Sequence, residues 1–288
     1  MQIPNVVNKA GRVAALAVLA AACGRAEASQ NDARQSAAPG EPRVVTVIAR
    51  DFAFEAPQSV PAGLVTINLQ NRGQALHHVA LMKLDEGKTL QDVFDAMRAG
   101  GPPPAWAHDM GGPNAPDPGA DANATLFLAP GNYALLCFVD IPDHVPHVMK
   151  GMARSLTVTP AAVPAAAVLP AGDITMRLND YSFGLSKPIT AGRHTIRVEN
   201  GAGQSHEVEL IKLAPGKTTQ ALMSWMQSMA GPPPASAIGG ISGMAPGQVQ
   251  AFSHDFAPGT YVLICFIPDQ GDGKPHFMHG MIQTITVA

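Results

Sequence analysis

The sequence predicts an all-β protein made of two tandem β-sandwiches, each interrupted by one short helix. The stretch from Val45 to Val158 returns as Ile174 to Val287, so the 288-residue chain carries an internal repeat and has room for two compact domains. In each copy, short runs that alternate apolar and polar residues are separated by turns rich in Gly and Pro. This pattern is typical of a β-sandwich.

Each copy starts with the strand pattern. Residues 45–49 and 65–71 place their apolar side chains on one face, and residues 194–200 repeat the second run. Turns are expected at Pro61-Ala62-Gly63 and at Ala129-Pro130-Gly131. In the first copy, the residues expected in the core are Val45, Val47, Ala49, Val65, Ile67 and Leu69.

One helix interrupts each copy. Thr89 can cap the first helix, with Asp92 completing a capping box. Gly-Pro-Pro-Pro runs at residues 101–104 and 231–234 end the helices, and a loop rich in Gly, Ala and Pro is expected after each of them. The apolar faces consist of Leu90, Val93, Phe94 and Met97 in the first copy, and of Leu222, Met223, Met226 and Met229 in the second.

The chain begins with a predicted signal peptide, residues 1–28. Lys9 and Arg12 supply positive charge before a short apolar run at residues 13–22, which is too short to span a bilayer. Two cleavage sites compete, a lipoprotein-type site at Cys23, which we favour, and an ordinary small-x-small site at residues 26–28. Both predict an exported protein in the periplasm or cell envelope. The first adds a lipid on Cys23 as the membrane attachment.

The remaining chain divides at two segments of linker composition. Residues 29–42 are predicted to form a flexible tether, and residues 159–172 a Pro/Ala linker. The domains are therefore expected at residues 43–158 and 173–288. Charged residues make up 14% of the chain and the net charge is −3, so nucleic acid is not an expected partner.

Each domain holds one cysteine. Cys137 and Cys265 occupy equivalent positions inside apolar strands, where they are poorly placed to bridge to each other. A lone thiol in an exported protein is either buried and inert or held by a metal. Its recurrence at the same repeat position favours the metal.

Three motifs recur around these cysteines. An Asn is followed six residues later by a His, an Ala-Pro-Gly-x-Tyr turn opens the strand that carries the Cys, and a His-x-x-x-Gly-Met segment follows it. This arrangement resembles the cupredoxin family, the small Greek-key sandwiches typified by plastocyanin and pseudoazurin. The resemblance covers both copies, and it implies a tandem cupredoxin-like fold with at most one type 1 copper in each domain.

The resemblance implies two ligand sets, because Cys, His and Met are soft donors that suit copper. Met149 and Met278 are alternative axial donors. His78 has Glu207 at its equivalent position and is expected to face solvent. The implied ligands are His77, Cys137, His147 and Met152 in the first copy, and His206, Cys265, His276 and Met281 in the second.

Two features depart from the better-known family members. Nine residues separate the Cys from the second His in the first copy and ten do so in the second, a loop longer than in plastocyanin. Neither Cys is flanked by His, which copper nitrite reductases and multicopper oxidases use to reach a second copper centre. The sequence therefore predicts a protein that is not an enzyme. The flanking residues are Leu136, Phe138, Ile264 and Phe266.

These observations lead to one functional expectation and one alternative. We expect a copper protein of the cell envelope that transfers electrons to or from a redox protein partner, or that handles copper. The alternative is a metal-free cupredoxin-like scaffold or binding module, in which the cysteines and histidines serve packing.

Overall fold

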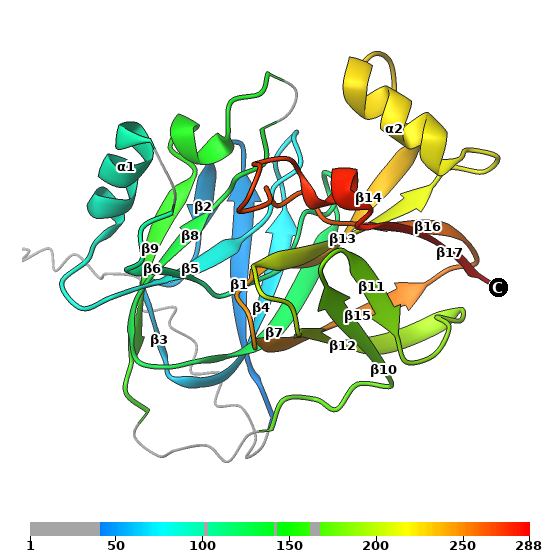
Figure 1. The fold of residues 1–288 in the computed structure, drawn as a ribbon. Helices are drawn as coiled ribbons and strands as arrows, with labels where there is room; N and C mark the ends of the chain where they lie inside the picture. The colour runs from blue at the N-terminus through cyan, green and yellow to red at the C-terminus, as the bar shows by residue number, and fades with distance from the viewer. Residues whose placement is uncertain (1–40, 101–102, 141–142, 162–167) are drawn as a thin grey trace, which may run out of the picture. The chain divides into compact units, whose positions relative to one another are not determined.

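The computed structural model describes residues 41–100, 103–140, 143–161 and 168–288. The predicted signal peptide with Cys23, most of the tether and the middle of the linker lie outside these residues. The described part contains two β-sandwiches, each with one α-helix (Figure 1). The all-β prediction with one short helical insertion in each copy is therefore confirmed. The domain boundaries stay a prediction.

The first half is built from strands β1 to β9. One four-stranded layer has the order β2-β1-β4-β7, and it faces a five-stranded sheet with the order β3-β9-β8-β5-β6. The bounds are β1 (Arg43–Arg50), β2 (Ala53–Glu55), β3 (Ser59–Pro61), β4 (Gly63–Asn71), β5 (Ala80–Leu84), β6 (Ala107–Asp109), β7 (Asp121–Leu128), β8 (Gly131–Leu136) and β9 (Ala153–Thr159).

The second half repeats this plan with strands β10 to β17. Its layers have the orders β11-β10-β12-β15 and β14-β13-β16-β17. The bounds are β10 (Ile174–Asn179), β11 (Ser182–Leu185), β12 (Gly192–Asn200), β13 (His206–Leu213), β14 (Ala235–Met244), β15 (Val249–Phe256), β16 (Gly259–Ile264) and β17 (Ile282–Val287).

The alternation of apolar and polar residues along the strands places their apolar side chains in the core, as predicted. The apolar positions of β1 and β4 are buried between the two layers of the first half, since successive side chains point to opposite faces of a strand. β8 and β16 are buried on both faces. Tyr133, Leu135 and Cys137 line the sandwich core, whereas Ala134 and Leu136 lie under the helix.

The two helices cover the outer faces of β8 and β16. α1 (Leu90–Ala99) starts at Thr89, whose side chain forms the predicted capping box with Asp92. α2 (Thr219–Ser228) is capped by Thr218, and Leu222 is its buried anchor. Met229 caps the C-terminus of α2 in a left-handed conformation, so it does not extend the helical stripe. None of the helices in the described residues is long and apolar enough to cross a membrane.

The segments after the helices differ from the predicted loops. Residues 235–244 form β14, which pairs with β13, and in the first half residues 110–116 form antiparallel bridges with β14. Backbone approaches closely at Gly112 and Gly240, where a Cβ atom would lie 2.3 and 2.1 Å from the carbonyl oxygens of Val79 and Val208. Glycine is required at such contacts, so these two glycines allow the backbones to come close enough to pair.

These bridges join the halves. Met110 pairs with Met244, Pro113 with Ile241 and Pro116 with Ile238. β7 also pairs with β15, which merges one layer of each half into an eight-stranded sheet. Equivalent segments of the two copies thus contact each other, as at an isologous dimer interface.

Candidate metal centres

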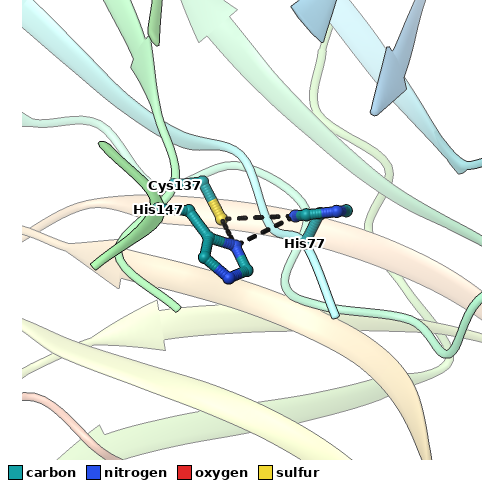
Figure 2. A group of neighbouring side chains, drawn as sticks. All are labelled: His77, Cys137 and His147. Atoms are coloured by element: carbon teal, nitrogen blue, oxygen red, sulfur yellow. Dashed lines mark hydrogen bonds between the residues drawn. The ribbon is translucent and has the colours of Figure 1, made fainter. Parts of the chain in front are cut away.

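Three donor atoms of the first half converge at one end of the sandwich. The Cys137 Sγ lies 3.5 Å from His147 Nδ1 and 4.0 Å from His77 Nδ1, and the two nitrogens are 3.1 Å apart (Figure 2). All three side chains are buried. Along the chain, Cys137 is 60 positions from His77 and 10 positions from His147, and the fold brings the three residues into one cluster.

The second half repeats this geometry. Cys265 Sγ lies 3.3 Å from His276 Nδ1 and 4.0 Å from His206 Nδ1. The donor atoms lie within 4.8 Å of one another, and all three residues are buried. The internal repeat therefore extends to side-chain geometry, since both halves present one sulfur and two Nδ1 atoms to a common point.

An asparagine shapes the loop that carries the first histidine of each set. Asn71 Nδ2 donates to the carbonyl oxygens of Ala75 and Pro116, and its Oδ1 accepts from Gly73 N–H. Asn200 makes the equivalent bonds in the second half. The recurring Asn of the sequence motif thus fixes the turn from which His77 and His206 enter the site.

Two carboxylates orient these histidines from behind. Asp51 Oδ1 lies 2.9 Å from His77 Nε2, and Asp180 Oδ1 lies 2.6 Å from His206 Nε2. A carboxylate that accepts from Nε2–H leaves the Nδ1 lone pair facing the cluster. Sequence reasoning missed both residues. Their equivalent repeat positions, each followed by an aromatic residue, were the available signal.

The second histidine of each set begins a single turn of 3₁₀ helix. These turns are η1 (His147–Lys150) and η2 (His276–His279), and Gly151 and Gly280 end them at φ 99° and 105°. Only glycine adopts this left-handed conformation without strain. The chain then reverses so that Met152 N–H donates to His147 O and Met281 N–H to His276 O. The Gly-Met pair of the motif is explained by this reversal.

The structure distinguishes the candidate axial donors by exposure. Met152 and Met281 are fully buried in the same core clusters as Cys137 and Cys265. Met149 and Met278 are 48% and 61% exposed. Burial therefore favours Met152 and Met281 as the thioethers near each site.

Burial determines the protonation states of the donor residues. Burial raises the pKa of the Cys137 thiol to about 12 and also raises that of Cys265. Burial lowers the pKa values of His77 and His206, although the carboxylates beside them act in the opposite direction. Burial also lowers the pKa of His276 to about 4. At neutral pH these three imidazoles are neutral and offer lone pairs, whereas the thiol requires a cation to become a thiolate.

The donor spacing fits a soft metal ion. Bonds of about 2.0–2.1 Å to nitrogen and about 2.3 Å to sulfur, in a trigonal arrangement, separate the donors by roughly 3.5–3.8 Å. The separations of 3.1–4.0 Å in the first half bracket this range. One thiolate, two imidazoles and a distant thioether form the ligand set of a blue-copper site.

His78 does not face solvent, contrary to the expectation from sequence, and neither does its repeat equivalent Glu207. Their side chains are buried between the halves, where burial lowers the pKa of His78 to about 4 and raises that of Glu207 to about 7. Asn114 bonds both of them. The expectation was wrong because a difference between repeats suggested exposure, whereas these positions meet across the contact between the copies.

No family model and no curated protein matches this chain. Among solved structures, an auracyanin from Roseiflexus castenholzii is 24% identical and covers 42% of this chain and 100% of its own, with a TM-score of 0.28. A blue copper oxidase from Nitrosomonas europaea is 17% identical, with coverages of 85% and 86% and a TM-score of 0.25. A copper-containing nitrite reductase from Thermus scotoductus is 12% identical, with coverages of 86% and 62% and a TM-score of 0.23.

The two β-layers of each half, with a buried His/Cys/His group at one end, agree with the cupredoxin-like fold that the resemblance implied. The expectation that the chain is not an enzyme is corrected, since the matches that span about 85% of the chain are titled as a copper oxidase and a nitrite reductase. That expectation depended on the absence of a His beside each Cys. Such a His is one way to connect the site to a second copper centre, so its absence does not exclude an enzyme.

Proposed function

We propose that this protein binds one copper ion in each half and transfers electrons in the cell envelope. The convergence of one Sγ and two Nδ1 atoms in both halves supports the proposal. His77, Cys137 and His147 would hold the first ion and His206, Cys265 and His276 the second, with Met152 and Met281 as weak axial donors. Bound copper would supply a one-electron couple.

Rigid donors favour electron transfer over simple storage. The two imidazoles in each set are fixed by Asp51 or Asp180 and by the 3₁₀ turns, and all the donors are buried. A ligand set that does not rearrange between Cu(I) and Cu(II) costs little reorganisation, and burial slows exchange of the ion. Copper handling, the other role that the sequence predicted, would require a more accessible site.

Exposed apolar side chains close to the proposed ligands of the first site suit a protein partner. Phe52 lies edge-on to His147, with ring centres 5.1 Å apart, and is 39% exposed. Phe138, Val145 and Met149 are also exposed. Large apolar side chains left exposed beside a functional site are typical of interaction sites. We propose that a redox protein docks there. Export by the predicted signal peptide, with a lipid on Cys23, would place both proteins in the envelope.

Metal analysis combined with visible spectroscopy tests the proposal. Addition of Cu(II) to the purified protein should give two bound copper ions per chain and an intense thiolate-to-copper absorption. A colourless protein without copper would contradict the proposal and favour the metal-free scaffold. Cyclic voltammetry separates the two copper roles, because an electron carrier gives a fast reversible couple and a storage protein does not.

A further inference from the structure

A continuous chain of hydrogen bonds runs between the two candidate sites. Phe138 N–H donates to His78 Nε2 (2.8 Å), and His78 Nδ1 lies 3.2 Å from Asn114 Oδ1. Asn114 Nδ2 then donates to Glu207 Oε2 (3.3 Å), and Glu207 Oε1 accepts from Phe266 N–H (2.9 Å). Because His78 Nε2 accepts, its proton lies on Nδ1 and is donated to Asn114.

Both ends of this chain adjoin proposed copper ligands. Phe138 follows Cys137 and Phe266 follows Cys265, while His78 follows His77 and Glu207 follows His206. Glu207 N–H also donates to Cys265 Sγ at 3.4 Å. Each half therefore directs the residue after its first His ligand toward the backbone after its Cys ligand, and Asn114 connects the two residues.

Burial makes this bridge an unusual way to join two halves. His78, Asn114 and Glu207 are 9%, 3% and 6% exposed. Burying polar and ionisable groups costs free energy unless every bond is made, and apolar packing joins surfaces at lower cost. Covalent and hydrogen bonds do, however, couple electronic states better than van der Waals gaps do.

We propose that His78, Asn114 and Glu207 form an internal path along which an electron passes between the two copper sites. This inference rests on the proposed function. One site is oxidised by one electron while the other is reduced by one, no covalent bond forms or breaks, no net proton transfer is needed, and no third reactant takes part. The path makes the chain a two-site relay rather than a pair of independent carriers.

Charge gives the transfer a direction. Asp269 Oδ2 lies 3.9 Å from His276 Nε2 in the second half. A neighbouring carboxylate stabilises the more positive, oxidised ion. The second site should therefore lose its electron to the first.

Flash photoreduction of the copper-loaded chain tests the path. Cys137→Ser and Cys265→Ser variants give the spectrum and potential of each remaining site. After a substoichiometric electron pulse, the wild-type protein should show a redistribution phase whose rate does not depend on protein concentration. Asn114→Leu, which removes the central hydrogen bonds, should lose this phase while retaining both copper spectra.

Ser242→Ala is the matched control. Ser242 Oγ donates to Val79 O (2.9 Å), is fully buried and joins the halves without bonding to His78, Asn114 or Glu207. This variant loses a buried bond between the halves and should keep the phase. If Asn114→Leu fails to fold or to retain copper, His78→Phe removes the links on the first-half side and keeps a ring of similar volume.

The outcomes separate this inference from the proposed function. A protein without blue absorption refutes the function, whereas two blue sites without first-order exchange refute the relay alone. Unchanged exchange in bridge variants that retain both copper spectra would also overturn it, because the bridge would then be purely structural. Equal loss of the phase in Ser242→Ala would show that any disturbance between the halves slows the transfer, and would likewise overturn the specific path.

Discussion

The two halves present the same donors but place different groups over their second histidine. In the first half, Phe52 packs against His147, and Lys150 lies 4.8 Å from the Phe52 ring centre. Lys150 is balanced by Asp143, which lies 2.8 Å away. The first site therefore has an apolar cover whose nearby charge is neutralised.

In the second half, Tyr181 takes the place of Phe52. Its hydroxyl donates to Asp269 at 2.5 Å, and Gln204 donates to the same carboxylate. These partners are neutral, so the negative charge beside His276 is not balanced by them. A duplicated ligand set can thus be tuned to two potentials by a few residues around it, which is what a directional relay requires.

The largest effect should come from removing one thiol. Cys137→Ser and Cys265→Ser should each reduce bound copper from two ions to one per chain, because the thiolate is the strongest soft donor of its site. Metal analysis and the visible spectrum measure this loss. If either variant lost both ions, the halves would not be independent binding units. If either retained two, its cysteine would not be a ligand.

Removal of a carboxylate behind a histidine should have the next largest effect. Asp51→Asn should weaken copper binding in the first half, and Asp180→Asn in the second, by about 10- to 100-fold, since outer partners orient metal ligands. Competition with a chelator measures the affinity. Asp173→Asn is the matched control, since Asp173 bonds His194, which is not a proposed ligand. Equal effects of all three variants would contradict the orienting role.

Proton release should be the same in both halves. The thiols have raised pKa values, and His77, His206 and His276 have lowered ones, so binding near neutral pH should displace a proton from sulfur. Affinity should then rise by about tenfold per pH unit between roughly pH 7 and 9, and fall as pH decreases. Chelator competition across this range, in single-site variants, checks the slope. A flat profile would show that the thiol is not deprotonated on binding.

The smallest effect should be a change of potential in one half. Asp269→Asn should raise the potential of the second site by on the order of tens of millivolts, because a nearby negative charge that favours the oxidised ion is lost. Voltammetry of the Cys137→Ser background isolates that site. Asp272→Asn is the control, because Asp272 pairs with Lys274. A larger shift of the potential in the control would mean that the charge of the loop in general, rather than Asp269, sets the difference in potential between the two sites.

The repeat allowed most of each half to be predicted from sequence. Alternation placed Val65, Ile67 and Leu69 in the core, and the capping box at Thr89 marked the start of α1. The ligand types followed from three motifs that recur together. These features depend on neighbouring residues or on the two-residue period of a strand, so they can be predicted directly from the order of residues in the sequence.

Contacts between the copies could not be predicted in this way. The expected loop at residues 235–244 is β14, and the pairing of β7 with β15 has no signal in either strand alone. His78 was assigned to solvent because the second copy has Glu207 at the same position, and nothing in the sequence says which faces of the two halves meet. Asp51 was missed because its bond to His77 spans 26 positions.

X-ray absorption at the copper edge of the fully loaded protein tests the central claim most directly. The account predicts that each copper has one short bond to sulfur and two to imidazole nitrogen, with two such ions per chain. A spectrum without a short copper–sulfur bond, or one that shows such a bond for only half of two bound ions, would contradict the claim that both halves hold copper through Cys and two His.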